Sequence, residues 1–206
     1  MSMNKQKFIY KTTGILTLVA VVISVIIAAQ NTKASVPPAV GSYLSTIAGS
    51  DWIVMAQGAL GTAPSDLSFL KTIDGQTAND YSTYILALTS LGKDPRYFGS
   101  ENLVETLRQK ANGGQLGDTA LVNDDMFGVL ALVSAGVPIG DSLVVSEAVY
   151  IKSKQLADGS WDFSATTTNG SVDMTAMSIM ALRAAGVAAS DPALIKAVAY
   201  LAGSQK

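Results

Sequence analysis

An Ala-x4-Gly pattern recurs four times along this sequence, each time at the end of an apolar stretch. A glycine just past the last apolar turn favours a helix C-cap, because glycine adopts the left-handed backbone conformation at no steric cost. Pro, Asp or both follow each glycine within a few residues, which is typical of the start of the next helix. The copies begin at Ala56, Ala87, Ala131 and Ala181. The pattern predicts a chain of helical hairpins built from repeats.

Two kinds of helical segment alternate. The segments near 79–91, 123–135 and 171–186 are apolar nearly all round, which indicates burial on every side. The segments between them carry a single apolar stripe, as at Leu194, Ala197, Val198 and Leu201. We therefore predict an all-α fold with an inner and an outer layer and essentially no sheet. We expect about nine helices after the N-terminal segment, each of about 10 to 16 residues.

The stretch 155–161 reads Gln-Leu-Ala-Asp-Gly-Ser-Trp and follows a predicted amphipathic helix. Asp158-Gly159 is typical of a tight turn. The Gln155 amide can bond to carbonyl groups that the helix end leaves free, and Trp161 can bury its ring while its N–H finds a partner. We interpret Gln155, Gly159 and Trp161 as a structural motif that fastens consecutive hairpins together.

Weaker copies of this turn occur elsewhere. Residues 74–76 (Asp-Gly-Gln) and 112–115 (Asn-Gly-Gly-Gln) look like the same turn, with Gln76 and Gln115 in the position of Trp161. At the C-terminus, Tyr200 to Gln205 match the start of a further copy, which stops before Gly-x-Trp. The chain therefore holds one complete motif and several partial ones.

The complete motif reads aromatic-aliphatic-x3-Gln-x3-Gly-x-Trp from Tyr150 to Trp161. It resembles the Gln-Trp repeat of the squalene cyclase and prenyltransferase (terpenoid cyclase) superfamily, closest in style to secreted bacterial prenyltransferase-like repeat proteins. The resemblance covers about residues 40 to 206 and implies an (α/α) toroid, which is a ring of helical hairpins. Because the closed ring has more repeats, we expect a partial toroid of about four hairpins. We favour C-terminal truncation over a mature open arc.

The first residues stand apart from the repeats. Lys5, Lys7 and Lys11 precede residues 12–30, which are largely apolar. That length is close to the minimum for a membrane span and long for a signal-peptide core. The basic flank should stay in the cytoplasm.

We therefore predict three regions. Residues 1–34 form a signal anchor or, as the alternative, a cleaved signal peptide; residues 35–40 are a linker; and residues 41–206 are the repeat domain. The domain is expected outside the cytoplasm, anchored to the membrane or secreted if the N-terminal segment is cleaved.

Composition excludes several functions. The sequence has 0 Cys and 0 His, so it lacks Ser-His-Asp and Cys-His catalysis, disulfides and the usual zinc ligands. We therefore do not expect the activity of the zinc-dependent protein prenyltransferases of the superfamily. All 16 acidic residues follow position 50, which argues against nucleic acid as a partner. We expect no cofactor and no bound metal.

Three aspartates are candidate catalytic acids. The resemblance implies an Asp-x-Asp-Asp acid motif before an inner helix, and only Asp173 survives in the matching stretch 171–176. Asp124 and Asp125 form a second candidate at the start of another apolar segment. The alternative interpretation of Asp173, Asp124 and Asp80 is helix N-capping. The adjacent pair Asp124-Asp125 also leaves open a divalent-cation site.

We expect a non-catalytic binding or interaction module that takes a small apolar ligand or a protein partner. Aromatic residues make up only 7% of the chain, whereas carbocation chemistry needs aromatic faces around the substrate. The first alternative is a terpene-cyclase-like enzyme, or its degenerate descendant, that cyclises a polyprene with an Asp acid. A second alternative is a spacer on the cell surface.

Overall fold

The structure is a computed structural model that describes residues 38–46, 49–62, 64, 66–71, 73 and 75–205. Residues Gly41–Lys206 form one compact unit. The helices of these residues are α2 (Pro38–Thr46), α3 (Asp51–Ala59), a 3-10 helix η1 (Ser68–Lys71), α4 (Ala78–Ser90), α5 (Leu103–Gln109), α6 (Asn123–Ser134), α7 (Ser142–Ser153), α8 (Val172–Ala184) and α9 (Pro192–Ser204). The all-α prediction is therefore confirmed.

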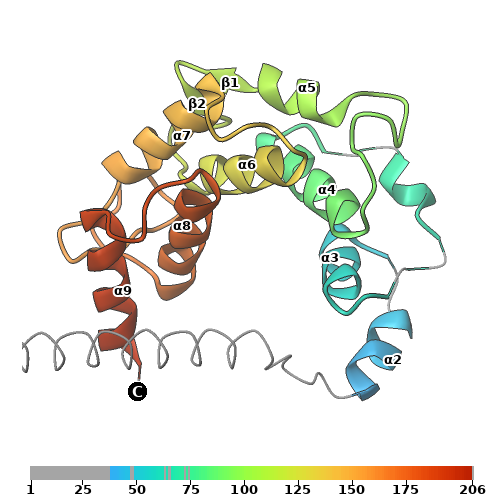
Figure 1. Ribbon diagram of the computed structural model, residues 1–206, viewed down its shortest axis with the longest axis horizontal. Helices are drawn as coiled ribbons and strands as arrows, with labels where there is room; N and C mark the ends of the chain where they lie inside the picture. Colours follow the sequence, from blue (N-terminus) through green and yellow to red (C-terminus); the bar gives the residue numbers. More distant parts are fainter. Residues whose placement is uncertain are drawn as a thin grey trace, which may run out of the picture. The chain divides into compact units, whose positions relative to one another are not determined.

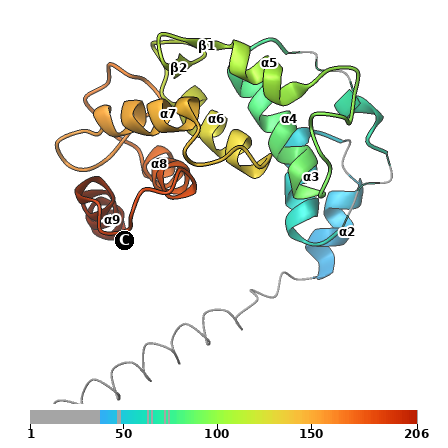
Figure 2. The ribbon, with the colours of Figure 1, turned by 45° about the horizontal axis from the view of Figure 1, so that its top comes forward.

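The helices lie in two layers (Figures 1 and 2). Helices α3, α4, α6 and α8 pack one against the next in that order. Helices α5, α7 and α9 form the second layer, where α5 packs on α4, α7 on α6 and α8, and α9 on α8. The chain therefore alternates between layers from α4 onward. Between α3 and α4, the single 3-10 turn of η1 stands where later repeats have an outer helix.

Glycine caps end the inner helices, as the repeated pattern predicts. Gly61, Gly92, Gly136 and Gly186 follow α3, α4, α6 and α8, with φ values of 70°, 67°, 80° and 85°. After each of them, the next residue's N–H bonds to the carbonyl five residues back, for example from Val137 to Leu132 at 3.0 Å. This six-to-one bond is the Schellman arrangement, so the predicted caps are confirmed.

Side-chain caps begin the helices. Thr77 and Asp80 form a reciprocal capping box at the start of α4, in which the Asp80 carboxylate accepts from the Thr77 N–H at 2.8 Å. Asp141 and Asp191 cap α7 and α9 by accepting from the N–H two residues on. Asp80 is therefore a helix cap, as the alternative interpretation held.

Ion pairs repeat between successive outer helices. Arg108 in the last turn of α5 lies 3.0 Å from Asp141, the N-cap of α7. Lys152 in the last turn of α7 lies 2.6 Å from Asp191, the N-cap of α9. Each aspartate thus lies at the positive N-terminal end of one outer helix. It pairs there with a basic side chain from the negative C-terminal end of the outer helix before it.

A small hairpin departs from the expectation of essentially no sheet. Strand β1 (Ala111–Asn112) pairs antiparallel with β2 (Gln115–Leu116). Gly113 and Gly114 between them have φ values of 64° and 86°. Two consecutive positive φ angles make the tight turn that closes a hairpin, so the sequence copy of the Asp-Gly turn folds differently here.

Helix α8 is less buried than the sequence suggests. Its buried residues are Thr175, Ser178, Ala181 and Leu182, whereas Met180 is 57% exposed. Helices α6, α7 and α9 cover one side of α8 and leave Met180 on the uncovered side. The apolar composition of α8 therefore predicts more burial of this helix than its neighbours among the described residues provide.

Among the described residues, no helix is long and apolar enough to cross a bilayer. The predicted anchor at residues 12–30 lies outside the described residues, as does residue 74 of the first partial turn.

Candidate functional site

Trp161 lies at the junction of α7 and α8. Its side chain is fully buried, and the indole Nε1 donates to the carbonyl of Ile151 at 2.6 Å. Its backbone N–H donates to the Thr175 hydroxyl at 3.1 Å. One residue thereby ties the last turn of α7 to the first turn of α8.

Gln155 and Gly159 extend this fastening to α9. The Gln155 amide donates to the carbonyls of Gly159 at 2.9 Å and of Ala193 at 2.7 Å. Gly159 has a φ of 92°, and a Cβ at this position would lie 2.6 Å from the Lys196 carbonyl oxygen. Both the backbone angle and the close approach of α9 require glycine here.

The C-terminal partial motif, from Tyr200 to Gln205, links α9 to a loop through Tyr200. The Tyr200 hydroxyl donates to the Gly170 carbonyl at 3.3 Å and so links α9 to the loop before α8. Gln205 follows the last turn of α9 and is exposed.

The first candidate acid, Asp173, lies on the surface. It is the second residue of α8 and is exposed. The nearby Ser171 hydroxyl and the Met174 N–H lower the pKa of its carboxyl. This environment favours the ionised form, whereas a proton donor must hold its proton at working pH.

Asp124 is buried at the start of α6. Its Oδ2 accepts from the Asp118 N–H at 3.0 Å, which holds the loop between β2 and α6. Burial raises the pKa of its carboxyl, and the hydrogen bond from Asp118 partly opposes that shift. Val122, the residue before α6, makes no side-chain capping bond, and the Asp124 carboxylate binds the loop before the helix.

Asp125 is completely buried and faces Glu147 of α7. Its Oδ1 accepts from the Leu116 N–H at 3.1 Å. Burial raises the pKa of Asp125 to about 6 and that of Glu147 to about 10, and each carboxyl also shifts the other. Asp125 Oδ2 and both Glu147 oxygens have no fixed donor in the described part of the chain. A proton held by Glu147 can be donated to Asp125, which pairs one oxygen of each carboxyl group.

Glu147 was missed by the sequence reasoning, although its position carried a signal. It lies on the buried face of α7 with Val144, Ala148 and Ile151. These positions are i, i+3, i+4 and i+7, so a carboxyl stands where an apolar stripe predicts an apolar residue. Its partner Asp125 belongs to another helix, which local periodicity does not reveal.

The motif in the second repeat is displaced by one residue. Gln115 donates its amide to the carbonyls of Asp118 at 2.9 Å and Leu121 at 3.3 Å, as Gln155 does in the complete motif. Leu116 is fully buried, and its N–H bonds to a side chain of the next inner helix. Leu116 therefore occupies the position equivalent to Trp161 in the second repeat, whereas the sequence predicts Gln115 there.

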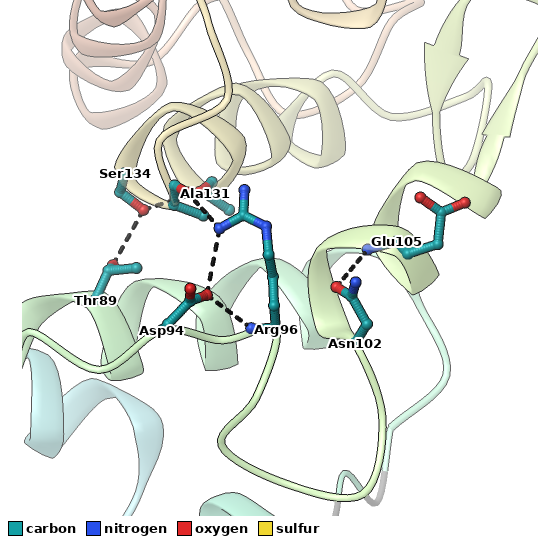
Figure 3. A network of polar contacts seen from close by, with 8 residues as sticks. Thr89, Asp94, Arg96, Asn102, Glu105, Ala131 and Ser134 are labelled. Atoms are coloured by element: carbon teal, nitrogen blue, oxygen red, sulfur yellow. Dashed lines mark hydrogen bonds and ion pairs between the residues drawn. The ribbon is translucent and has the colours of Figure 1, made fainter.

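A polar network joins α4 and α6 at their C-terminal ends (Figure 3). The Arg96 guanidinium donates to Asp94 at 3.2 Å and to the Ala135 carbonyl at 2.8 Å. The Thr89 and Ser134 hydroxyls lie 3.0 Å apart. These contacts satisfy carbonyls at the end of α6, so the network is part of the repeat junction.

In the described residues, no three acidic side chains come together as a metal ion requires. Asp124 and Asp125 point to different partners, Asp118 and Leu116. Adjacency in sequence therefore does not make them a pair in space.

Alternating helices in two layers, fastened by a Gln-Gly-Trp turn, define a class of α-helical hairpin-repeat proteins. Residues 139–204 match the family model described as the squalene-hopene cyclase N-terminal domain. This stretch contains α7, α8 and α9 together with the turn from Gln155 to Trp161. The resemblance to the squalene cyclase (terpenoid cyclase) superfamily is therefore confirmed. No curated protein matches the chain significantly.

Proposed function

We propose that this chain is a squalene-cyclase-like repeat domain, arranged as a partial (α/α) toroid, that serves as a non-catalytic binding module. The family match supports the cyclase-like fold. The N-terminal basic and apolar segment supports a location outside the cytoplasm, with the membrane as one partner through that segment.

The observation that carries the proposal is the state of Asp173. This aspartate alone survives from the acid motif, and it is exposed with a lowered pKa. An ionised carboxylate in water has no proton to give to an alkene. Asp173 is therefore a poor donor of the proton with which cyclisation of a polyprene begins.

Two pockets in the described residues support the same proposal. One pocket of about 330 Å³ lies at the C-terminal ends of α4 and α6, and one of about 440 Å³ lies at their N-terminal ends. Neither lining, as the described residues form it, contains Phe, Tyr or Trp. Carbocation intermediates need such faces for stabilisation.

One observation favours the alternative of a cyclase-like enzyme or its descendant. Glu147, with a pKa raised to about 10, keeps its proton at neutral pH, as a catalytic acid must. However, Glu147 is completely buried between α6 and α7, and neither pocket reaches it or Asp125. The proton of Glu147 links α7 to α6 through Asp125.

The test is turnover by the whole chain, reconstituted in lipid nanodiscs and incubated with squalene. Products are extracted and analysed by mass spectrometry. We expect no cyclised product from the wild type, from Asp173→Asn or from Glu147→Gln. Asp162→Asn, a carboxylate change in the turn after Trp161, serves as the matched control.

Turnover by the wild type that Asp173→Asn abolishes, in a protein whose circular dichroism is unchanged, would overturn the proposal. Turnover abolished by Glu147→Gln would instead establish the cyclase alternative.

A further inference from the structure

The pocket at the N-terminal ends of α4 and α6 has features of a built site. Its volume is about 440 Å³, within the range of small-molecule sites. Three segments wall it: the first turn of α4, the end of α5 and the loop between β2 and α6. Residues from two successive repeats thus meet around one cavity.

Gly117 lets the loop before α6 approach Asp124 closely at this pocket. It has a φ of 71°, and a Cβ there would collide with the Asp124 carboxylate and lie 3.0 Å from the Ala78 methyl. Asp124, only 4% exposed, belongs to the lining. A side chain at position 117 would therefore displace Asp124 from its place in the wall.

Asn79 in the first turn of α4 also lines the pocket. Its amide Oδ1 is buried without a hydrogen-bond partner among the described residues, so that oxygen lies behind the lining and not at its surface. The accessible part of Asn79 adds a polar side chain to the wall.

The lining combines donors and acceptors. Asp118 and Asp124 present carboxyl groups, Asn79 an amide, and Lys110 an ammonium group that lies 5.2 Å from the centre of the Tyr81 ring. Leu121 adds an apolar surface. Hydroxyl groups can donate to the carboxylates and accept from the ammonium group, while ring C–H groups can lie on the leucine.

Other ligand classes fit the lining less well. Two carboxyl groups, with Asp80 close enough to act on Asp124, oppose a phosphate or another anion. Lys110 opposes a metal cation, and the described acids do not form a metal cluster. The polar walls are a poor surface for a polyprene.

We infer that this pocket binds a small neutral polyhydroxylated molecule of the size of one sugar unit. The inference rests on the proposed function, because it takes the domain to be a binding module. It names a polar ligand for this pocket in place of the apolar ligand that the sequence suggested.

The test follows methyl resonances of the full chain, labelled at alanine methyl groups and held in lipid nanodiscs. Glucose, mannose, N-acetylglucosamine and a trimer of the last are titrated separately, so that a free sugar and a glycan chain are distinguished. Saturable shifts of Ala78 with a Kd of about 1 mM or tighter are expected for at least one of them. Ala135, in the other pocket, should not move.

Two variants test the lining. Asn79→Ala and Lys110→Met should each weaken binding about tenfold, whereas Asn169→Ala, an exposed asparagine outside the pocket, should leave it unchanged. Asn79→Ala removes an unsatisfied group from a helix and should fold normally.

Absence of Ala78 shifts with every sugar, or shifts that persist unchanged in both variants, would overturn the inference. So would shifts with ethanolamine or inorganic phosphate in place of the sugars. Turnover of squalene by the same preparation would overturn the proposed function, whereas missing sugar binding without turnover refutes the sugar site alone.

Discussion

At the scale of single residues, Glu147 and Asp125 place two carboxyl groups in a fully buried helix junction. Such a pair is stable only while it carries a proton, because two buried charges of one sign repel and lose their hydration. The pair therefore couples the stability of the α6–α7 junction to pH.

The first prediction concerns this pH dependence. Glu147 has its pKa raised from 4.5 to about 10, so between these values the folded state holds a proton that the unfolded state has lost. Stability should therefore be greatest below about pH 4.5 for this group and fall as pH rises toward 10, by about 1.4 kcal/mol per pH unit. Asp125, raised from 3.8 to about 6, adds a loss of the same sign between those two values.

Glu147→Gln should flatten this profile, since the amide donates to Asp125 without titrating. Urea unfolding at pH 6 and at pH 9 measures both proteins. At pH 9 the variant should be the more stable of the two. A wild type that gains stability between pH 6 and 9, or a variant with the same slope as wild type, would refute the shared proton.

A second residue-scale prediction concerns Gly159. Gly159→Ala should destabilise the protein by about 1 to 3 kcal/mol, because the residue has a φ of 92° and a Cβ would meet the Lys196 carbonyl. Gly203→Ala is the matched control: it lies in the last turn of α9, and a Cβ there meets no described atom within 4 Å. The control should be neutral or stabilising in thermal unfolding. Equal effects of the two changes would contradict the structure.

At the scale of elements, repeated contacts hold successive helices together. Trp161 joins α7 to α8, Gln155 joins the turn to α9, and the ion pairs to Asp141 and Asp191 join the outer helices in order. Each contact uses an N–H, a carbonyl or a charge at a helix end. The repeat is thus stabilised at its corners as well as through its apolar core.

The two tryptophans test the role of the Gln-Gly-Trp turn. Trp161→Ala should cost about 3 to 5 kcal/mol, because it removes a fully buried ring and its bond to Ile151. Trp52→Ala should cost far less, since Trp52 is 55% exposed and contacts Phe127 at its edge. Denaturant unfolding followed by circular dichroism gives both values. A larger loss in Trp52→Ala would show that the turn does not hold the fold.

Asp141 allows its two contributions to be separated. Asp141→Ala removes both the N-cap of α7 and the ion pair to Arg108, and should cost about 1 kcal/mol. Asp141→Asn keeps a capping oxygen and loses only the partly exposed ion pair, so it should cost about half as much or less. The same unfolding measurement applies. An asparagine variant as unstable as the alanine variant would assign the whole effect to the ion pair.

At the scale of the whole molecule, the sequence predicts the helices and their glycine ends well. Local rules that act within one turn predict the positive φ angles at Gly61, Gly92, Gly136 and Gly186. They also predict the complete burial of Trp161. The family match over 139–204 agrees with the part of the chain that carries the complete motif.

What the sequence does not predict depends on neighbours distant in the chain. The pairing of Asp125 with Glu147 joins two helices, and the polar pocket is formed by segments of two repeats. The displaced motif at Leu116 arises because two glycines form a hairpin turn that composition does not distinguish from a helix end. The exposure of Met180 depends on which helices cover α8, a property that its own apolar sequence does not contain.

In this cyclase-like domain Asp173 lies in water with a lowered pKa, whereas Glu147 holds its proton between two helices. Carboxyl ¹³C NMR titration of the full chain measures both groups directly. We predict that Asp173 titrates below its ordinary pKa of 3.8 and that Glu147 remains protonated at pH 7. A protonated Asp173 at neutral pH, or an ionised Glu147, would contradict the account.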